Sequence, residues 1–274
     1  MTEKVVVVIG SGAIAQAIIR RIGIGKHILL TDINLEHAKN SAQTLQHAGF
    51  NVSTAWIDVS NRESVQNIAN QAVAMGDIVG VIHTAGLSPS QASAQEIIKV
   101  DLYGAALVLE IFGQVISQSG VALVIGSQSS HRLPINELTQ EQADSLATST
   151  PEELLQLPLI QKIDDSLYAY QISKKGNALR CQYEAVRFAQ RKARVNCISA
   201  GIIMTPLAYD ELNSPERGAF YRQMLAKSPA GRAGTPDEIA ALADLLFSDA
   251  GTYFSGSDIL MDGGATAMFK YGGV

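Results

Sequence analysis

Short apolar runs alternate with longer amphipathic stretches along most of the chain. Seven runs rich in Val, Ile and Leu are predicted strands: 5–9, 27–31, 52–57, 78–82, 121–125, 194–198 and 258–261. Helical periodicity covers the stretches 13–21, 34–47, 63–74, 93–117, 167–191 and 236–247. Apolar strands that alternate with helices are typical of an α/β fold, in which a parallel sheet is covered on both faces. No linker divides the chain into two domains.

One segment interrupts this alternation. Residues 135–166 are polar, contain two prolines and show two short helical patterns, at 139–146 and 151–157. They separate the fifth predicted strand from the long helix at 167–191. Such a long excursion is usually functional or interfacial, although a tolerated surface insertion gives the same pattern.

Composition narrows the classes of partner. The chain has 274 residues, 47% of them hydrophobic, and a formal net charge of −5. A nucleic-acid binder needs a basic face, so the negative charge argues against that class. The balance is that of an ordinary globular enzyme or binding protein.

The remaining composition predicts a cytoplasmic protein. Cys181 and Cys197 are the only cysteines and form no Cys-x-x-Cys motif, which indicates a reducing compartment. The apolar run 5–9 is too short for a signal peptide, and no run approaches the roughly 18 residues of a membrane span. The scattered histidines form no metal-ligand spacing, so no metal site is expected.

The first strand leads into a glycine turn. Gly10-Ser11-Gly12-Ala13-Ile14-Ala15 fits the G-x-G-x-x-G/A pattern between a strand and a helix. Gly10 permits the tight turn and Gly12 a close approach of a pyrophosphate to the helix N-terminus. Asp32 ends the second strand, where a carboxylate binds a ribose diol and repels a 2′-phosphate. The pattern predicts a dinucleotide site that prefers NAD to NADP.

Tyr170 and Lys174 are the most informative pair for chemistry. A spacing of four puts both side chains on one face of a helix. A nearby ammonium favours the phenolate and makes the phenol a better acid/base group. An ordinary surface pair has the same spacing, so the other motifs must decide between the two interpretations.

Several motifs occur in a fixed order and are more specific together than singly. They are the glycine turn, Asp32, Asp58-Val59, His83-Thr84-Ala85-Gly86, Ser127, Tyr170-x-x-x-Lys174, the runs 196–205 and 232–240, and Asp262-Gly263-Gly264. In this order the chain resembles the short-chain dehydrogenase/reductase family over residues 5–264. The resemblance implies one doubly wound, Rossmann-type domain over residues 1–274, with a seven-stranded parallel sheet.

The resemblance also implies roles. Tyr170 would be the acid/base, Lys174 would lower its pKa and bind the nicotinamide ribose, and Ser127 would hold the substrate oxygen. Ser129 and Ser130 lie close by, but Ser127 directly ends the strand. The implied cofactor-binding residues are Gly10, Ser11, Gly12, Ala13, Ile14, Asp32, Asp58, Val59, Thr84, Ala85, Gly86, Tyr170, Lys174, Ile203 and Thr205.

Some positions depart from the family pattern. His83-Thr84 stands where the family has two asparagines, and Ala200 replaces a proline. Asp101 occupies the position of the family's catalytic Asn, which helps to hold a water behind the lysine. A carboxylate there cannot donate as an amide does, and it favours the charged form of Lys174.

The family likeness also concerns assembly and substrate. The segment 135–166 is expected to cap the substrate pocket or to alter the oligomer, which would be a homodimer or homotetramer. Residues 206–228 are the expected substrate-binding loop. Their apolar side chains indicate a partly apolar alcohol or ketone substrate, and core packing explains them about equally well.

Four functions compete on these grounds. The leading hypothesis is an NAD-dependent oxidoreductase that interconverts a secondary alcohol and a ketone. A non-catalytic NAD-binding sensor or scaffold is second, because of Asp101 and the altered His83-Thr84 motif. A methyltransferase is third, although Tyr170 and Lys174 argue against it. A serine hydrolase is fourth, because the chain contains no Gly-x-Ser-x-Gly elbow.

Overall fold

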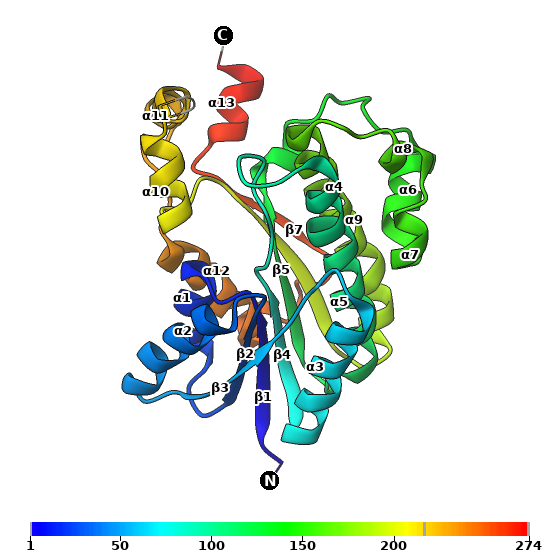
Figure 1. The fold of residues 1–274 in the computed structure, drawn as a ribbon, viewed down its shortest axis with the longest axis vertical. Coiled ribbons are helices and arrows are strands. Elements are labelled where there is room, and N and C mark those ends of the chain that lie inside the picture. The colour runs from blue at the N-terminus through cyan, green and yellow to red at the C-terminus, as the bar shows by residue number, and fades with distance from the viewer. Residues whose placement is uncertain (1, 216–217, 273–274) are drawn as a thin grey trace.

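A single parallel sheet forms the centre of the computed structural model, which describes residues 2–215 and 218–272 (Figure 1). Its strands are β1 (Lys4–Ile9), β2 (His27–Asp32), β3 (Asn51–Trp56), β4 (Asp77–His83), β5 (Val121–Ser127), β6 (Arg194–Ala200) and β7 (Asp258–Met261). They lie in the order β3-β2-β1-β4-β5-β6-β7, and every neighbouring pair is parallel. The predicted α/β fold with a seven-stranded parallel sheet is confirmed.

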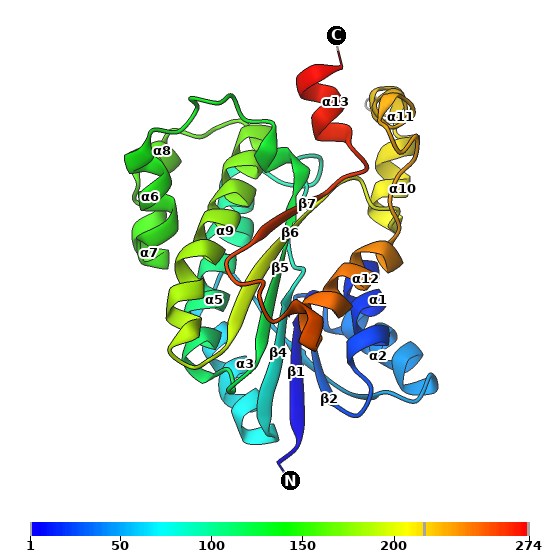
Figure 2. The same ribbon diagram turned by 180° about the vertical axis from the view of Figure 1, so that it is seen from behind.

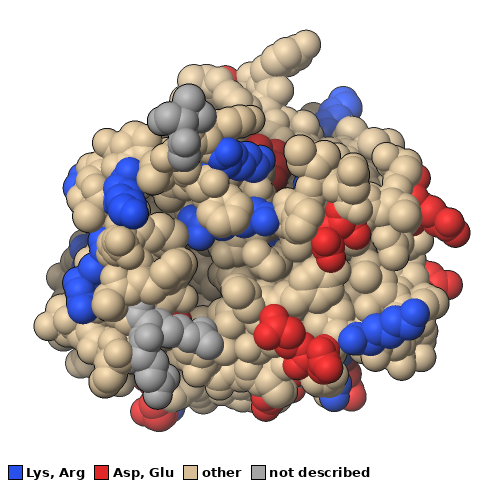
Figure 3. Space-filling view, turned by 90° about the horizontal axis from the view of Figure 1, so that it is seen from above, with Lys and Arg blue, Asp and Glu red and all other residues tan. Residues whose placement is uncertain are grey.

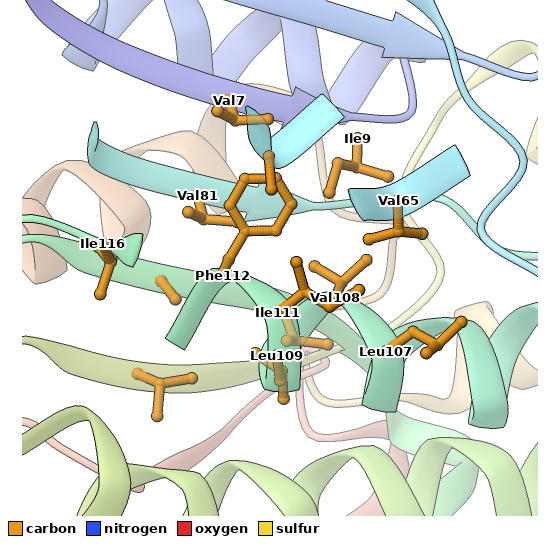
Figure 4. Packing of buried hydrophobic residues seen from close by; sticks show 14 of the residues in the cluster. Val7, Ile9, Val65, Val81, Leu107, Val108, Leu109, Ile111, Phe112 and Ile116 are labelled. Atoms are coloured by element: carbon orange, nitrogen blue, oxygen red, sulfur yellow. The ribbon is translucent and has the colours of Figure 1, made fainter. Parts of the chain in front are cut away.

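Helices cover both faces of the sheet. On one face lie α1 (Ala13–Ile22), α2 (Leu35–His47) and α12 (Pro236–Phe247), and on the other α3 (Arg62–Met75), α5 (Gly104–Val115) and α9 (Ser166–Ala189) (Figures 1 and 2). Phe112 of α5 is fully buried beside Val7 and Val81 of the strands (Figure 4). Burying each such side chain stabilises the fold by roughly 1.5–3 kcal/mol.

The strand order reverses between β1 and β4, at the middle of the sheet. Ligands of doubly wound folds bind beyond the carboxyl ends of the strands at this switch point. The helices α10 (Pro206–Asn213), α11 (Gly218–Lys227) and α13 (Ala265–Tyr271) stand above that end of the sheet (Figure 1). Helix α13 has no counterpart among the sequence predictions.

The predicted helix 93–117 is divided into three pieces. A short helix, α4 (Ala94–Ile97), leads through a π-helical turn at Ile98–Tyr103 into α5. Such wide turns are rare and often occur at functional sites. This one carries Asp101, which is fully buried and lies against α9.

The segment 135–166 forms three short helices outside α9: α6 (Gln140–Thr148), α7 (Pro151–Leu154) and α8 (Pro158–Gln161) (Figure 1). The predicted helix 151–157 ends early, because Pro158 disfavours helix in the preceding residue and starts a helix of its own. Leu146 and Leu154 are fully buried in a cluster with α9. Arg62 of α3 also donates hydrogen bonds to Glu152 at 2.8 Å. The segment is therefore packed onto the domain.

Among the described residues, every helix is too short or too polar to cross a bilayer.

Candidate active site

A cleft of about 610 Å³ opens at the carboxyl ends of β1, β2, β3 and β4. Most of the residues predicted to bind the cofactor line it: Gly10, Ser11, Gly12, Ala13, Ile14, Asp32, Asp58, Val59, Thr84, Ala85, Gly86 and Thr205. Three predicted residues, Tyr170, Lys174 and Ile203, lie outside this lining. The position of the cleft at the switch point and its size suit a dinucleotide.

The two glycines of the turn have different surroundings. Gly10 has a φ of +94°, and a Cβ there would lie 2.6 Å from Thr84 Oγ1, so both backbone and space require glycine. A Cβ on Gly12 would meet nothing within 4 Å, because that side of the turn faces the open cleft. Gly12 precedes α1 without a side-chain cap, which leaves the first N–H groups of the helix available. These features fit a bound pyrophosphate.

Asp32 is held at the edge of the cleft. Its carboxylate accepts hydrogen bonds from the backbone N–H of Ser11 at 2.9 Å and from the Ser11 hydroxyl at 2.7 Å. His37 Nδ1 lies 3.5 Å away. Burial opposes ionisation, but the hydrogen bonds from Ser11 and Asn34 outweigh it and lower the pKa of Asp32. A fixed negative charge therefore lies where the predicted ribose site begins.

Helix α9 brings Tyr170 to Ser127 at the end of β5. The Ser127 side chain favours the ionised form of the Tyr170 phenol, and Lys174 Nζ lies 5.3 Å from the centre of the Tyr170 ring. Burial raises the pKa of Tyr170, and this effect outweighs those of Lys174 and Ser127, which act in the opposite direction. Tyr170 is therefore a neutral phenol at pH 7, with a hydroxyl and an ammonium beside it.

Lys174 forms a direct ion pair with Asp101. Its Nζ lies 2.9 Å from Asp101 Oδ2, and both side chains are buried. The other carboxylate oxygen accepts a hydrogen bond of 2.7 Å from the backbone N–H of Leu87. Burial alone would lower the pKa of Lys174, but Asp101 and Tyr170 raise it. The lysine is therefore held as an ammonium.

Comparison with known proteins identifies the family of the chain. The family model described as enoyl-(acyl carrier protein) reductase matches residues 9–140 and 160–266. A short-chain dehydrogenase/reductase of Alternaria brassicicola, bsc3, is 32% identical over 98% of both chains. The chain belongs to the short-chain dehydrogenase/reductase family. The unmatched residues 141–159 fall inside the segment 135–166.

Further similar proteins carry more specific names. D-threitol dehydrogenase of Mycolicibacterium smegmatis is 28% identical over 88% of this chain and 84% of its own. The 3-alpha-hydroxysteroid dehydrogenase/carbonyl reductase of Comamonas testosteroni is 24% identical over 83% and 91%. A solved 3-alpha-hydroxysteroid dehydrogenase of Pseudomonas sp. B-0831, complexed with NADH, shares the fold with a TM-score of 0.76, 21% identity and coverage of 97% and 98%.

Two departures from the short-chain dehydrogenase/reductase pattern, Asp101 and His83, lie near Lys174. Asp101 contacts the lysine directly, and a Cβ on Gly86 would lie 3.0 Å from that carboxylate and 3.1 Å from Lys174 Nζ. His83 is buried, and neither ring nitrogen has a hydrogen-bond partner among the described residues. Burial and the nearby Lys174 lower the pKa of His83 to about 3, so its imidazole is neutral.

Some residues of the site were not found from the sequence. Ile33, His37, Ile57, Leu87 and Val100 also line the cleft, and so do Pro206 and Leu207, which belong to the expected substrate-binding loop 206–228. Most follow a strand end by one to five residues, so the strand boundaries give the only signal for them. The hydrogen bonds between Ser11 and Asp32 depend on side-chain placement, which no sequence motif specifies.

Proposed function

We propose that the protein is an NAD-dependent oxidoreductase that interconverts a secondary alcohol and a ketone, with Tyr170 as the acid/base. The observation that carries this proposal is the grouping of Tyr170, Ser127 and Lys174 at the carboxyl end of the sheet that also forms the dinucleotide-sized cleft. Relatives named as hydroxysteroid and threitol dehydrogenases support alcohol and ketone chemistry in general.

The proposed steps divide among three side chains. Ser127 holds the substrate oxygen by a hydrogen bond and so polarises the carbonyl. Tyr170 donates its proton to that oxygen during reduction and accepts it back during oxidation. Lys174 remains an ammonium throughout and stabilises the phenolate. The nicotinamide, when bound in the cleft, supplies or accepts the hydride.

The raised pKa of Tyr170 gives the two directions different pH dependence. Reduction needs the neutral phenol, which is the populated form at pH 7. Oxidation needs the phenolate, so its rate rises as the pH approaches the pKa of Tyr170.

The most direct test of the proposal is a panel of secondary alcohols with NAD and of ketones with NADH, followed by nicotinamide absorbance. The panel includes hydroxysteroids, sugar alcohols and hydroxyacyl compounds, and a complete lack of turnover would reject the proposal.

The preference for NAD rests on Asp32. Replacing Asp32 with Ala should weaken NAD binding about 10- to 100-fold, because a charged acceptor of ribose hydrogen bonds is lost. NADP binding should weaken less or improve, because the repulsion of its 2′-phosphate is removed. Titration of both cofactors measures the two dissociation constants, with Asp77→Asn at the far end of the sheet as the control. Tighter binding of NADP than NAD by the unmodified protein would contradict the assignment.

The role of residues 135–166 remains a prediction. Their helices cover the outer side of α9, where Arg180 donates hydrogen bonds to the backbone oxygens of Leu146 and Ser149. Deleting residues 139–161 should change the oligomer mass or the substrate range, because the outer side of α9 becomes exposed. Light scattering and the alcohol panel measure the two properties. If neither changes, the segment is a tolerated surface insertion.

A further inference from the structure

Arg132 lies between the end of β5, which carries Ser127, and the expected substrate-binding loop 206–228. It follows Ser127 by a single 3-10 turn, Gln128–His131. Its guanidinium lies 5.6 Å from the centre of the Phe269 ring on α13, and its Nη1 contacts Met224 Sδ on α11 at 3.2 Å. Arg132 therefore lies at the carboxyl end of the sheet, in contact with α11 and near α13. Both helices stand above that end of the sheet (Figure 1).

One edge of the guanidinium makes no hydrogen bond to a described residue. Its Nε and Nη2 atoms are both buried, and neither has a hydrogen-bond partner among the described residues. These are the two nitrogens whose N–H groups point in the same direction and form the planar fork that binds a carboxylate in bidentate fashion. Buried donors without partners are costly, which makes a missing acceptor the natural explanation for this pair.

The carboxylate that interacts with Arg132 does not fill this role. Asp262 favours the charged form of Arg132, yet the two form no ion pair within 4 Å in the described part of the chain. Its two oxygens instead accept hydrogen bonds from the backbone N–H groups of Gly264, at 2.9 Å, and Thr266, at 2.7 Å. The fork of Arg132 remains free for another anion.

A small cavity lies beside the neighbours of Arg132. Its volume is about 80 Å³, and Gln128, Met224 and Asp262 line it, whereas Arg132 itself is not part of the lining. Seen from above, Lys and Arg side chains lie beside the central hollow at this end of the molecule (Figure 3). An anionic group that enters from this face meets positive charge close to the hollow.

We propose that Arg132 is a specificity-determining residue that binds a carboxylate carried by the alcohol or ketone substrate. The proposal rests on the proposed oxidoreductase function and narrows its substrate to hydroxy acids and oxo acids. The carboxylate takes the Nε and Nη2 donors of Arg132, while the reacting hydroxyl lies at Ser127 and Tyr170. Apolar side chains such as Met224 then contact the carbon chain between the two ends.

The test compares charged and neutral versions of one substrate. Straight-chain hydroxy acids of graded length, each with a secondary hydroxyl on the penultimate carbon, are assayed with NAD beside their primary amides. The unmodified enzyme should have a higher kcat/KM for at least one acid than for its amide. Arg132→Met should lower kcat/KM for that acid about 10- to 100-fold and lower that for the amide much less, because the neutral amide gains only an uncharged hydrogen bond from Arg132. Arg132→Lys keeps the charge without the fork. Its kcat/KM for the acid should lie between those of the unmodified enzyme and Arg132→Met.

Two controls separate recognition from structure. Phe269→Leu removes the ring beside the guanidinium and leaves the fork, so the acid preference should persist. Melting temperatures of all variants show whether they fold. Equal losses for acid and amide in Arg132→Met, or no acid preference in the unmodified enzyme, would overturn the proposal.

If the protein is not an oxidoreductase, the assays give a result that differs from a failure of the carboxylate site. In that case neither acids nor amides turn over, and calorimetry with the NAD-bound protein decides the binding question. If the protein binds a hydroxy acid and Arg132→Met abolishes this binding, the carboxylate site is supported without the oxidoreductase function. Equal binding of acid and amide, or no binding of either, would reject it.

Discussion

Replacing Tyr170 with Phe should reduce turnover by about 100- to 10,000-fold, the usual contribution of a positioned general acid/base. The substitution removes only the hydroxyl that interacts with Ser127, and the ring beside Lys174 remains. The cofactor cleft does not include Tyr170 in its lining, so the dissociation constant for NAD should change little. Steady-state kinetics with the best alcohol of the panel and a titration with NAD measure the two effects.

Tyr168 provides a matched control on the same helix. Its hydroxyl interacts with Glu137 of the segment 135–166 and not with Ser127, so Tyr168→Phe should retain turnover. The comparison also separates the proposed enzyme from the alternative of a non-catalytic NAD sensor. A sensor binds NAD but has no turnover to lose in either variant. Full activity of Tyr170→Phe would assign the proton transfer to another group.

The fold could be predicted because its signals are local. Each strand is a short Val/Ile/Leu run, and the glycine turn falls between a strand and a helix in the order that a doubly wound sheet requires. Helix boundaries followed capping residues such as Thr235, whose side chain accepts from the N–H of Glu238. The C-terminal helix α13 was missed, because its seven residues are too few to show a clear period.

The site was only partly predictable, because its chemistry depends on contacts between distant elements. The motifs placed Tyr170 and Asp101 on separate helices, but only the structure shows that Asp101 and Lys174 form a direct buried ion pair. The π-helical turn that carries Asp101 has no pattern of its own in the sequence. The free edge of Arg132 is likewise invisible in a sequence, because it is defined by the absence of nearby acceptors among the described residues.

The Lys174–Asp101 pair leads to the largest expected effect on stability. Lys174→Met should lower the free energy of unfolding by about 3–5 kcal/mol, because it leaves the fully buried carboxylate of Asp101 without its counter-charge. Turnover should also fall steeply, because no ammonium remains to stabilise the Tyr170 phenolate. Denaturant-induced unfolding and steady-state kinetics measure these two losses.

A second substitution separates the two roles of the lysine. In Lys174→Met/Asp101→Asn the buried charge is gone, while the side-chain oxygen of Asn can still accept from the N–H of Leu87. The double variant should therefore regain most of the stability and none of the turnover. Recovery of turnover would show that the ammonium is not needed.

The stability loss in Lys174→Met should depend on pH. Burial already raises the pKa of Asp101, and the loss of Lys174 removes the group that opposes this shift. The folded variant therefore binds a proton at Asp101 more tightly than the unfolded chain does. Its stability relative to the unmodified protein should fall as the pH rises above the pKa of an unfolded aspartate, roughly 4, and recover at lower pH. An equal loss at every pH would mean that the carboxylate of Asp101 is not the source of the destabilisation.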